Sequence, residues 1–440
     1  GILLAGGVVV PLPPYHNADR MAQLIEIANV KLLVDSPATA TASSNLPFMS
    51  DPQTISLDQT ARLKCCVPAP PRQCPDSLAM MLFTSGSTGE PKAVMLSHRN
   101  VLSNAQSICG FLPIDANDRT LAIMPFAHAL GNSVLQTHIL SGACLVFGND
   151  LQFPTAVRDA LIQQNCTSLT GVPEVFEGLL LAIQGVATQF PHLRYLAVAG
   201  GRMDGVQANE LAEKMAPAEF YLMYGQTEAT ARLAYLPPHE LRQHADTIGR
   251  AIPGVELAVL DEDCQPVPQG QQGMLFARGD NIMLGYWGDP DATSRILKNG
   301  WLNTGDLARL DENGFFRICG RANGLIKIQG YRFHPCEVEQ LLARRLNDVQ
   351  LVATPVDLRG RTRLALFARS RSDRLVTANE IRQACLQLLP RHMMPHRYEI
   401  VDDWPLNSAH KIDRLALCSR LSATRPPETP GSLTCSLAAD

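Results

Sequence analysis

The chain has 440 residues, 46% of them hydrophobic and 18% charged, so it can bury substantial cores in two or three domains. Its formal net charge of −4, with basic residues spread along the chain, argues against nucleic acid or an anionic membrane as a partner. The twelve cysteines show no CxxC pair and no Cys/His metal spacing, which indicates reduced thiols in a cytoplasmic protein.

The apolar opening, residues 1–10, is too short to span a bilayer and follows no basic segment, so neither a membrane span nor a signal peptide is predicted. A first residue that is glycine, inside a helix-end and strand pattern, indicates a truncated N-terminal part. Apolar runs then alternate with amphipathic segments, which is the α/β pattern. The predicted strands are 30–34, 78–83, 120–124, 143–147, 167–170, 194–199 and 220–223, and the predicted helices are 18–29, 97–111 and 155–164.

Beyond Tyr235 the pattern changes to strands and turns, with strands predicted at 255–260 and 274–278. The acidic cluster between them, residues 261–263, indicates a solvated hairpin turn and not a metal site. A last unit begins near Gly320. It contains predicted helices at 335–345 and 381–389 and strands at 349–354 and 364–368, with Thr377 and Glu380 forming a capping box for the second helix.

The most informative segment follows the strand at 78–83 and has the composition of a phosphate-binding loop. Hydroxyl groups, backbone N–H groups beside glycines and one ammonium group can all contact phosphate oxygens. The candidate residues are Thr84, Ser85, Gly86, Ser87, Thr88, Gly89 and Lys92. Pro91 before the lysine and Ala93 after it exclude the nucleoside-triphosphatase loop. A polar surface loop is the alternative.

The run TSGSTGEPK at residues 84–92 resembles the phosphate loop of the adenylate-forming superfamily, which includes acyl-CoA and aryl-CoA synthetases, adenylation domains of peptide synthetases, and luciferases. The resemblance implies an α/β fold with a large multi-sheet domain, residues 1–320, whose N-terminal part, on the order of a hundred residues, is missing. It also implies a small mobile α+β C-terminal lid domain at 321–420, followed by a tail at 421–440. Ala93 stands where this family usually has glycine.

The segment YGQTE at 224–228 resembles the family's second nucleotide motif. The resemblance implies that Tyr224 stacks on adenine, Gly225 forms a tight turn, Thr227 contacts the α-phosphate and Glu228 binds Mg²⁺. A carboxylate beside a triphosphate requires such a cation, because like charges repel. Gly200 and Gly201 resemble the loop on the adenine side, and an ordinary strand-to-helix turn is the alternative.

The segment TGD at 304–306 is predicted to present the Asp306 carboxylate on a glycine turn, and this carboxylate can accept hydrogen bonds from two ribose hydroxyls. The segment matches the family's ribose motif. The resemblance assigns Asp306 to ribose and Arg321 to ribose or phosphate. Residues 320–332 resemble the hinge of the C-terminal domain, with Asn323 at the hinge position. The Asn323–Gly324 pair readily adopts a left-handed conformation with positive φ, which suits a hinge. The cofactor-binding candidates of this segment are Lys327, Gly330 and Arg332, the last two at positions that face the thiol channel. Solvated strand residues are the alternative for Lys327 and Arg332.

The segment 405–414 resembles the terminal motif that carries the family's catalytic lysine, here Lys411, although His410 replaces the usual glycine. An ammonium group there stabilises the charge that develops when a carboxylate attacks the α-phosphate. The segment PFAH at 125–128 resembles the motif whose histidine, His128, lines and gates the acyl pocket, and a purely structural histidine is the alternative. Ala129 cannot pair with a substrate ammonium group, which argues against an α-amino acid.

Together these motifs predict an ATP-dependent, AMP-forming acid–thiol ligase. A small-molecule carboxylic acid of fatty, aryl or polyketide type is activated as an acyl-adenylate with release of pyrophosphate. Transfer to a thiol follows, with ATP, Mg²⁺ and coenzyme A as cofactors and co-substrate. The alternatives are loading of a free acyl-carrier protein, amide formation with an amine in a secondary-metabolite pathway, and a non-catalytic homologue.

Overall fold

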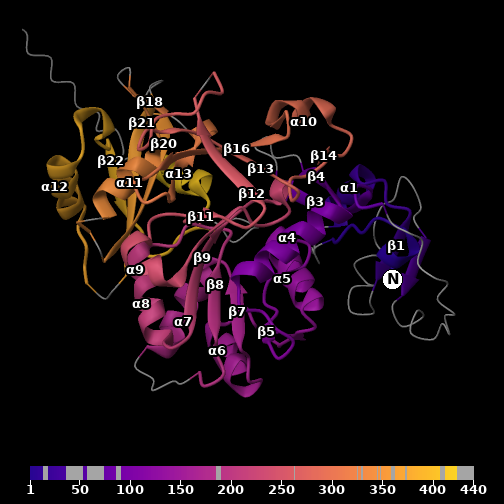
Figure 1. Cartoon of the computed structure of the whole chain (residues 1–440). Helices are drawn as coiled ribbons and strands as arrows, with labels where there is room; N and C mark the ends of the chain where they lie inside the picture. Colours follow the sequence, from indigo (N-terminus) through magenta and orange to yellow (C-terminus); the bar gives the residue numbers. More distant parts are fainter. Residues whose placement is uncertain are drawn as a thin grey trace, which may run out of the picture. The chain divides into compact units, whose positions relative to one another are not determined.

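The computed structural model describes residues 1–12, 18–35, 53–56, 74–85, 91–184, 190–261, 263–324, 326–328, 331–343, 345–346, 348–357, 362–371, 374–406 and 412–423. The chain divides into two compact units, Gly1–Ala322 and Asn323–Asp440 (Figure 1). Within the described ranges, no helix combines the length and the apolar character needed to cross a membrane.

The first unit is built on a seven-stranded sheet in the order β11-β10-β9-β8-β7-β5-β6. Neighbours from β6 to β9 are all parallel, and β10 and β11 add antiparallel strands at one edge. The bounds are β5 Arg119–Leu121, β6 Cys144–Val146, β7 Ser168–Gly171, β8 Tyr195–Val198, β9 Glu219–Tyr224, β10 Ala234–Leu236 and β11 Arg250–Ala251.

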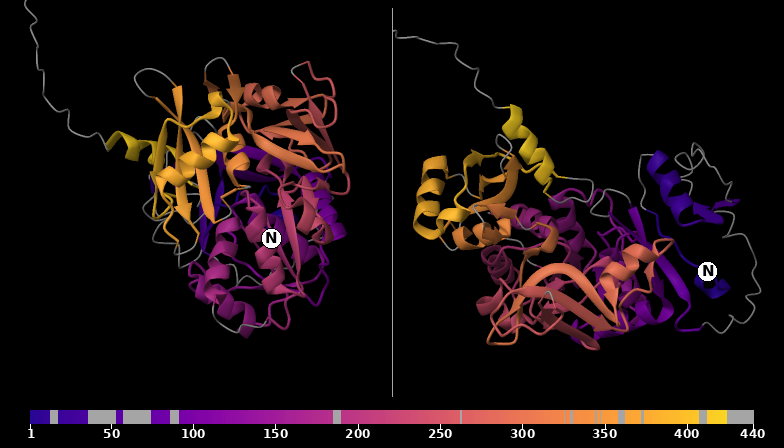
Figure 2. Two further views of the ribbon diagram at one scale, coloured as in Figure 1. Left: turned by 90° about the vertical axis from the view of Figure 1, so that its left-hand side faces the viewer. Right: turned by 90° about the horizontal axis from the view of Figure 1, so that it is seen from above.

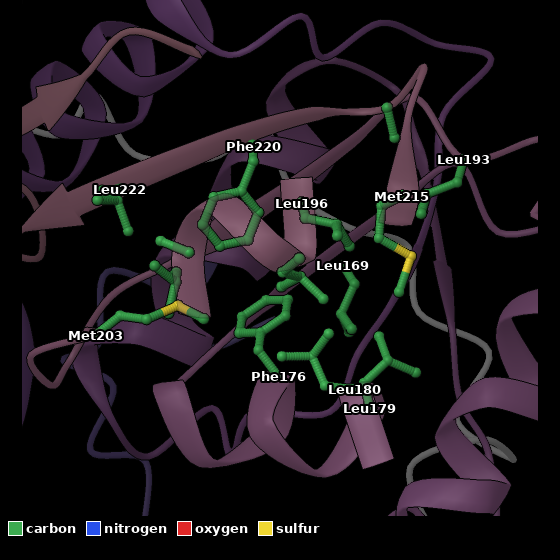
Figure 3. Close-up of a cluster of buried hydrophobic side chains, with 14 of the residues drawn as sticks. Leu169, Phe176, Leu179, Leu180, Leu193, Leu196, Met203, Met215, Phe220 and Leu222 are labelled. Atoms are coloured by element: carbon green, nitrogen blue, oxygen red, sulfur yellow. The ribbon is translucent and has the colours of Figure 1, made fainter. Parts of the chain in front are cut away.

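Helices cover both faces of this sheet, as expected for strands that are apolar on both sides. On one face, α6 (Pro154–Gln163), α7 (Pro173–Ile183) and α8 (Gly205–Met215) pack against Leu196 of β8 and Phe220 of β9 (Figure 3). On the other face, α4 (His98–Phe111) and α5 (Ala129–Leu140) enclose a second cluster that contains Tyr221 and Met223 of β9. Each fully buried large side chain contributes about 1.5–3 kcal/mol.

The described residues of the first unit also form three smaller sheets. A five-stranded antiparallel sheet has the order β12-β13-β16-β15, with β17 beside β16. Its strands are β12 Val255–Leu260, β13 Gly273–Gly279, β15 Leu297–Lys298, β16 Trp301–Leu310 and β17 Phe316–Arg321. A three-stranded sheet, β14-β4-β3, contains β3 Leu78–Ser85, β4 Pro91–Ser97 and β14 Gly285–Tyr286. The third consists of the parallel pair β1 Leu32–Asp35 and β2 Gln53–Ser56. The other helices among the described residues of this unit are α1 Ala18–Ile27, α9 Leu241–His244 and α10 Pro290–Ile296, with 3-10 helices η1 Leu3–Ala5, η2 Thr227–Ala229 and η3 Pro238–Glu240.

The described residues of the second unit form two small sheets and three helices. They are coloured orange to yellow in Figure 2. Its elements are β18 Ile326–Ile328, β19 Tyr331–Phe333, β20 Val349–Asp357, β21 Thr362–Ser370, β22 Arg397–Ile400, α11 Pro335–Ala343, α12 Ala378–Leu388 and α13 Arg414–Ala423, with 3-10 helices η4 Ala322–Gly324, at the junction of the units, and η5 Arg391–Met393. Helices α11 and α12 pack on one face of the sheet β20-β21-β22. Leu417 of α13 packs on the opposite face.

The predicted fold class, α/β with several sheets and a smaller α+β unit, is confirmed. Predicted helices and strands of the large sheet lie within a few residues of their observed bounds. The predicted glycine turn at residues 304–306 is wrong, because these residues belong to β16, with Gly305 at φ 72° inside the strand. Only one of the two hydrogen bonds of the expected capping box of α12 is present. The Thr377 side chain accepts a hydrogen bond from the backbone N–H of Glu380, whereas the carboxylate of Glu380 pairs with Arg374.

Candidate active site

The predicted ligand-binding segments follow the carboxyl ends of adjacent parallel strands. The chain passes from β5 to His128, from β7 to Val172, from β8 to Gly200, and β9 ends at Tyr224. Ligands of α/β sheets bind at this edge, where loops and helix N-termini surround a crevice. The sheet therefore brings together motifs that are separated by nearly a hundred residues in the sequence.

The strands on either side of the predicted phosphate loop form a β-hairpin. Strands β3 and β4 pair antiparallel, with Thr84 opposite Lys92. Gly86, Ser87, Thr88 and Gly89 lie outside the described residues, as does the side chain of Ser85. The ammonium group of Lys92 lies 4.9 Å from the centre of the Tyr286 ring, in a cation–π contact.

Tyr286 links this lysine to the predicted metal ligand. Its hydroxyl donates a hydrogen bond of 2.8 Å to Oε1 of Glu228. Burial, reinforced by the neighbouring Glu228 carboxylate, raises the pKa of Tyr286, so the hydroxyl stays protonated and remains a donor. Lys92, Tyr286 and Glu228 thus form a contiguous set: a cation, an aromatic ring and an oriented carboxylate.

A second set joins the predicted adenine and ribose residues. The Tyr224 hydroxyl donates to Oδ2 of Asp306, and Nε of Arg321 lies 2.8 Å from Oδ1 of the same carboxylate. Asp306 and Arg321 are opposite each other in the β16–β17 register. Burial, followed by the charge of Asp306, raises the pKa of Tyr224. The structure therefore brings all three predicted nucleotide residues into one hydrogen-bonded chain.

The segment between Tyr224 and Arg232 folds back tightly on itself. A Cβ atom on Gly225 would lie 1.8 Å from the carbonyl oxygen of Ala231, so only glycine fits there. Thr230 has φ 64° and ψ −54°, and Ala231 N–H donates to Ala229 C=O at 2.7 Å, which defines a γ-turn. A β-branched residue in this region is strained by about 1–3 kcal/mol. This turn follows η2, which carries Thr227 and Glu228.

Gly200 and Gly201 lie against the loop that enters α7. Gly200 has φ 82°, and a Cβ atom there would lie 3.2 Å from Cγ1 of Val172 and 3.7 Å from Cδ2 of Leu130. His128 is half-buried at the N-terminus of α5, two residues before Leu130. The side chain of Leu130, two residues after the predicted acyl-pocket histidine, therefore lies next to Gly200.

The C-terminal candidates lie in the second unit. Lys327 and Arg332 are opposite each other on β18 and β19, but their side chains are outside the described residues, as are Gly330 and Lys411. Asn323 and Gly324 belong to η4, and Gly324 does not adopt the left-handed conformation considered for this hinge. The roles of these residues remain predictions.

Sequence comparison places the chain in a family. The profile described as AMP-binding enzyme matches residues 1–287. The chain belongs to the AMP-binding enzyme family. A long-chain-fatty-acid–CoA ligase of Escherichia coli O6:H1 is 32% identical over 354 residues, which are 79% of this chain and 62% of that ligase. The chain thus spans less than two thirds of the length of the curated ligases that it matches.

Solved structures show the same fold for this AMP-binding family member. The amide bond synthetase McbA from Marinactinospora thermotolerans superposes with a TM-score of 0.85 at 23% identity, covering 96% of this chain and 86% of McbA. ATP-bound MatB from Rhodopseudomonas palustris gives a TM-score of 0.83 at 24% identity, covering 95% of this chain and 84% of MatB. The agreement extends through both units of the chain.

Two residues of this AMP-binding protein that bear on the site were not predicted from the sequence. Tyr286 contacts both Lys92 and Glu228, and Arg232 is a buried cation just beyond the γ-turn. For Tyr286, the short segment GYW carries no recognisable signal. Its position depends on the pairing of β14 with β4, which joins residues nearly two hundred positions apart. For Arg232, the sequence did contain a usable signal, because an arginine in an otherwise apolar segment indicates a buried charge.

Proposed function

We propose that this chain activates a carboxylic acid with ATP. The acid's carboxylate oxygen bonds to the α-phosphorus, the bond from that phosphorus to the bridging oxygen breaks, and pyrophosphate leaves. The observation that carries the proposal is a pair of side-chain sets that meet at the segment following β9, which runs from Tyr224 to Glu228. Tyr224, Asp306 and Arg321 form the set for the nucleoside, and Lys92 with Glu228 forms the set for the phosphates. Family membership supports ATP as the nucleotide.

Glu228 is the proposed Mg²⁺ ligand. Mg²⁺ is commonly bound by one or two carboxylates together with substrate phosphates and water, so a single oriented carboxylate beside a phosphate-binding lysine fits this ion. Among the described residues there is no cluster of three or more His, Cys, Asp or Glu side chains that would hold a metal without a nucleotide. When bound, the ion would neutralise phosphate charge, while Tyr286 keeps the carboxylate of Glu228 in place.

The nucleoside side of the site is proposed to select ATP over pyrophosphate or simple phosphates. Asp306 is 4% exposed and is held between the Tyr224 hydroxyl and Arg321. A carboxylate fixed in this way can accept hydrogen bonds from ribose hydroxyls without first losing side-chain freedom. The Tyr224 ring, fixed through its own hydroxyl, offers a flat surface for adenine.

The second step is proposed to be transfer of the acyl group to the thiol of coenzyme A, with AMP as the leaving group. Residues 321–420 would act as a mobile lid domain, with residues 421–440 as a tail, Lys411 as the catalytic cation of the first step, and Lys327, Gly330 and Arg332 near the thiol. The described cysteines are free thiols, as expected in the reducing cytoplasm, which is the proposed compartment.

A carrier protein or an amine is the alternative acceptor. The chain is similar both to a CoA ligase, whose acceptor is a thiol, and to an amide bond synthetase, whose acceptor is an amine. These similarities therefore support either kind of acceptor. Acceptor choice does not alter the first step, because all these routes share the acyl-adenylate.

The test is acid-dependent exchange of labelled pyrophosphate into ATP, measured across fatty, aromatic and polyketide-type acids. Exchange that requires both the acid and Mg²⁺ is the expected result. Acceptors are then compared by product: an acyl-CoA, an acylated carrier protein or an amide. Absence of exchange with every acid, in a protein that still binds ATP, would identify a non-catalytic homologue.

A further inference from the structure

Arg232 is a buried cation beside the candidate site. It is 3% exposed, and its Nε–H donates to the thioether sulfur of Met223 at 3.3 Å. Within the described ranges, no carboxylate or other oxygen acceptor is hydrogen-bonded to its guanidinium. A thioether is only a weak acceptor, and an unpaired buried charge is unfavourable. The guanidinium therefore lacks the partner that its burial requires.

The backbone of Arg232 is held firmly. The side chain of Asn104 accepts from its N–H at 3.3 Å and donates to its C=O at 3.0 Å, and Asn281 donates to the same C=O at 3.0 Å. Burial lowers the pKa of Arg232 to about 10, so the side chain is still charged at neutral pH. The protein thus maintains a fixed positive charge at this position.

The surroundings of this charge are continuous with the predicted acid pocket. Met223 belongs to the apolar cluster on the α4–α5 face of the sheet, together with Leu130, Val172 and Ala199. Leu130 and Val172 are also the side chains that approach Gly200. The terminal nitrogens of Arg232 are not among the fully enclosed unpartnered atoms of the described chain, so they contact space that water can enter.

We propose that the acid activated by this chain carries a second carboxylate, remote from the reacting one, and that Arg232 binds it. The proposal rests on the proposed function and specifies its substrate class as dicarboxylic acids. A guanidinium group binds a carboxylate through two parallel hydrogen bonds, which also orients the substrate. The apolar side chains between Met223 and Gly200 suit the methylene groups between the two carboxylates. The second carboxylate is unchanged by the reaction and only the first is adenylated.

The test compares dicarboxylic acids with monocarboxylic acids of equal carbon number, from butyrate and succinate to octanoate and suberate, in pyrophosphate exchange. The wild type is expected to prefer the diacid of the best length by about tenfold or more in kcat/KM. Arg232→Met should remove this preference, and Arg232→Lys should retain part of it. Arg242→Met, which removes an exposed charge on α9, is the matched control and should behave as the wild type.

The outcomes separate the inference from the function on which it rests. Exchange with monocarboxylates at the same efficiency, unchanged by Arg232→Met, overturns the inference and leaves the proposed function intact. If no acid supports exchange, the proposed function fails, and thermal unfolding with succinate, adipate or suberate decides the inference. An increase in Tm in the wild type that Arg232→Met abolishes supports the site, and no increase overturns it. If Arg232→Met does not fold, Arg232→Lys is used instead; it should reduce the diacid preference and the Tm increase, and no reduction in either overturns the inference.

Discussion

Removing the hydroxyl of Tyr286 tests whether Glu228 is a positioned metal ligand. In Tyr286→Phe the ring is kept, so the cation–π contact with Lys92 is retained and only the 2.8 Å hydrogen bond to Glu228 is lost. A hydrogen bond to a charged group contributes about 1.5–3 kcal/mol, and Glu228 is only half-buried, so the lower end applies. That free energy corresponds to about a tenfold decrease in kcat/KM.

The assay is Mg²⁺-dependent pyrophosphate exchange at saturating acid, with Mg²⁺ varied. Tyr286→Phe should raise the Mg²⁺ concentration needed for half-maximal exchange, because the carboxylate is less well positioned. In a Glu228→Ala background the same substitution should have little further effect, since its partner is already absent. Tyr221→Phe is the matched control. It removes a hydroxyl that donates to Glu219 at 2.7 Å, a similar tyrosine–glutamate pair at the opposite end of β9.

The role of Tyr286 in positioning Glu228 is refuted if Tyr286→Phe changes exchange by less than about twofold at every Mg²⁺ concentration. It is also refuted if Tyr221→Phe alters the Mg²⁺ dependence to the same extent. An equal loss in both variants would mean that the measured effect reports general packing around buried tyrosines.

Four further changes are expected to alter ATP binding, catalysis or stability. Asp306→Asn should raise KM for ATP by about tenfold or more while changing KM for the acid much less, because the charged partner of Tyr224 and Arg321 is removed. Gly225→Ala should lower both Tm and activity, because the added Cβ would overlap the carbonyl of Ala231. Gly110→Ala in α4 is the control: its Cβ would meet only an ordinary contact at 3.8 Å, so Tm should be unchanged or raised. Lys411→Ala should abolish adenylation but leave transfer from a supplied acyl-adenylate largely intact, and equal loss of both steps would contradict its assigned role. Burial lowers the pKa of His334 from 6.5 to about 4, so the unfolded chain binds more protons than the folded chain between pH 6.5 and pH 4. The free energy of unfolding should therefore fall by no more than about 3 kcal/mol as the pH decreases through this range. Denaturant unfolding of His334→Asn should show a smaller decrease.

The large sheet was predictable because its strands are defined by local sequence. Continuous apolar runs such as Leu196–Ala199 lie between helices with apolar faces, and both patterns are visible within ten residues. The observed strands differ from the predicted ones only at their ends, where hydrogen bonding to a neighbour decides the boundary.

The short antiparallel strands were not predictable in the same way. Strands β10, β11, β14 and β15 have two or three residues each, too few for an alternating pattern to be recognised. They exist because a partner strand far away in the sequence supplies their hydrogen bonds. The same reason explains the wrong turn at residues 304–306. β13 and β17 flank this segment and keep it within the sheet, and Gly305, at φ 72°, lies where the β13–β16 register shifts.

Sequence motifs identified the nucleotide residues separately, but they could not show that these residues depend on one another. Tyr224 ends a strand of the large sheet, whereas Asp306 lies on β16 of the five-stranded sheet, and their hydrogen bond joins the two sheets within the first unit. Because Arg321 contacts the same carboxylate, Asp306 connects all three residues. A substitution at Asp306 should therefore release the hydroxyl of Tyr224 and the guanidinium of Arg321 together. Single substitutions in this set should be non-additive, which double-mutant cycles on ATP affinity would measure.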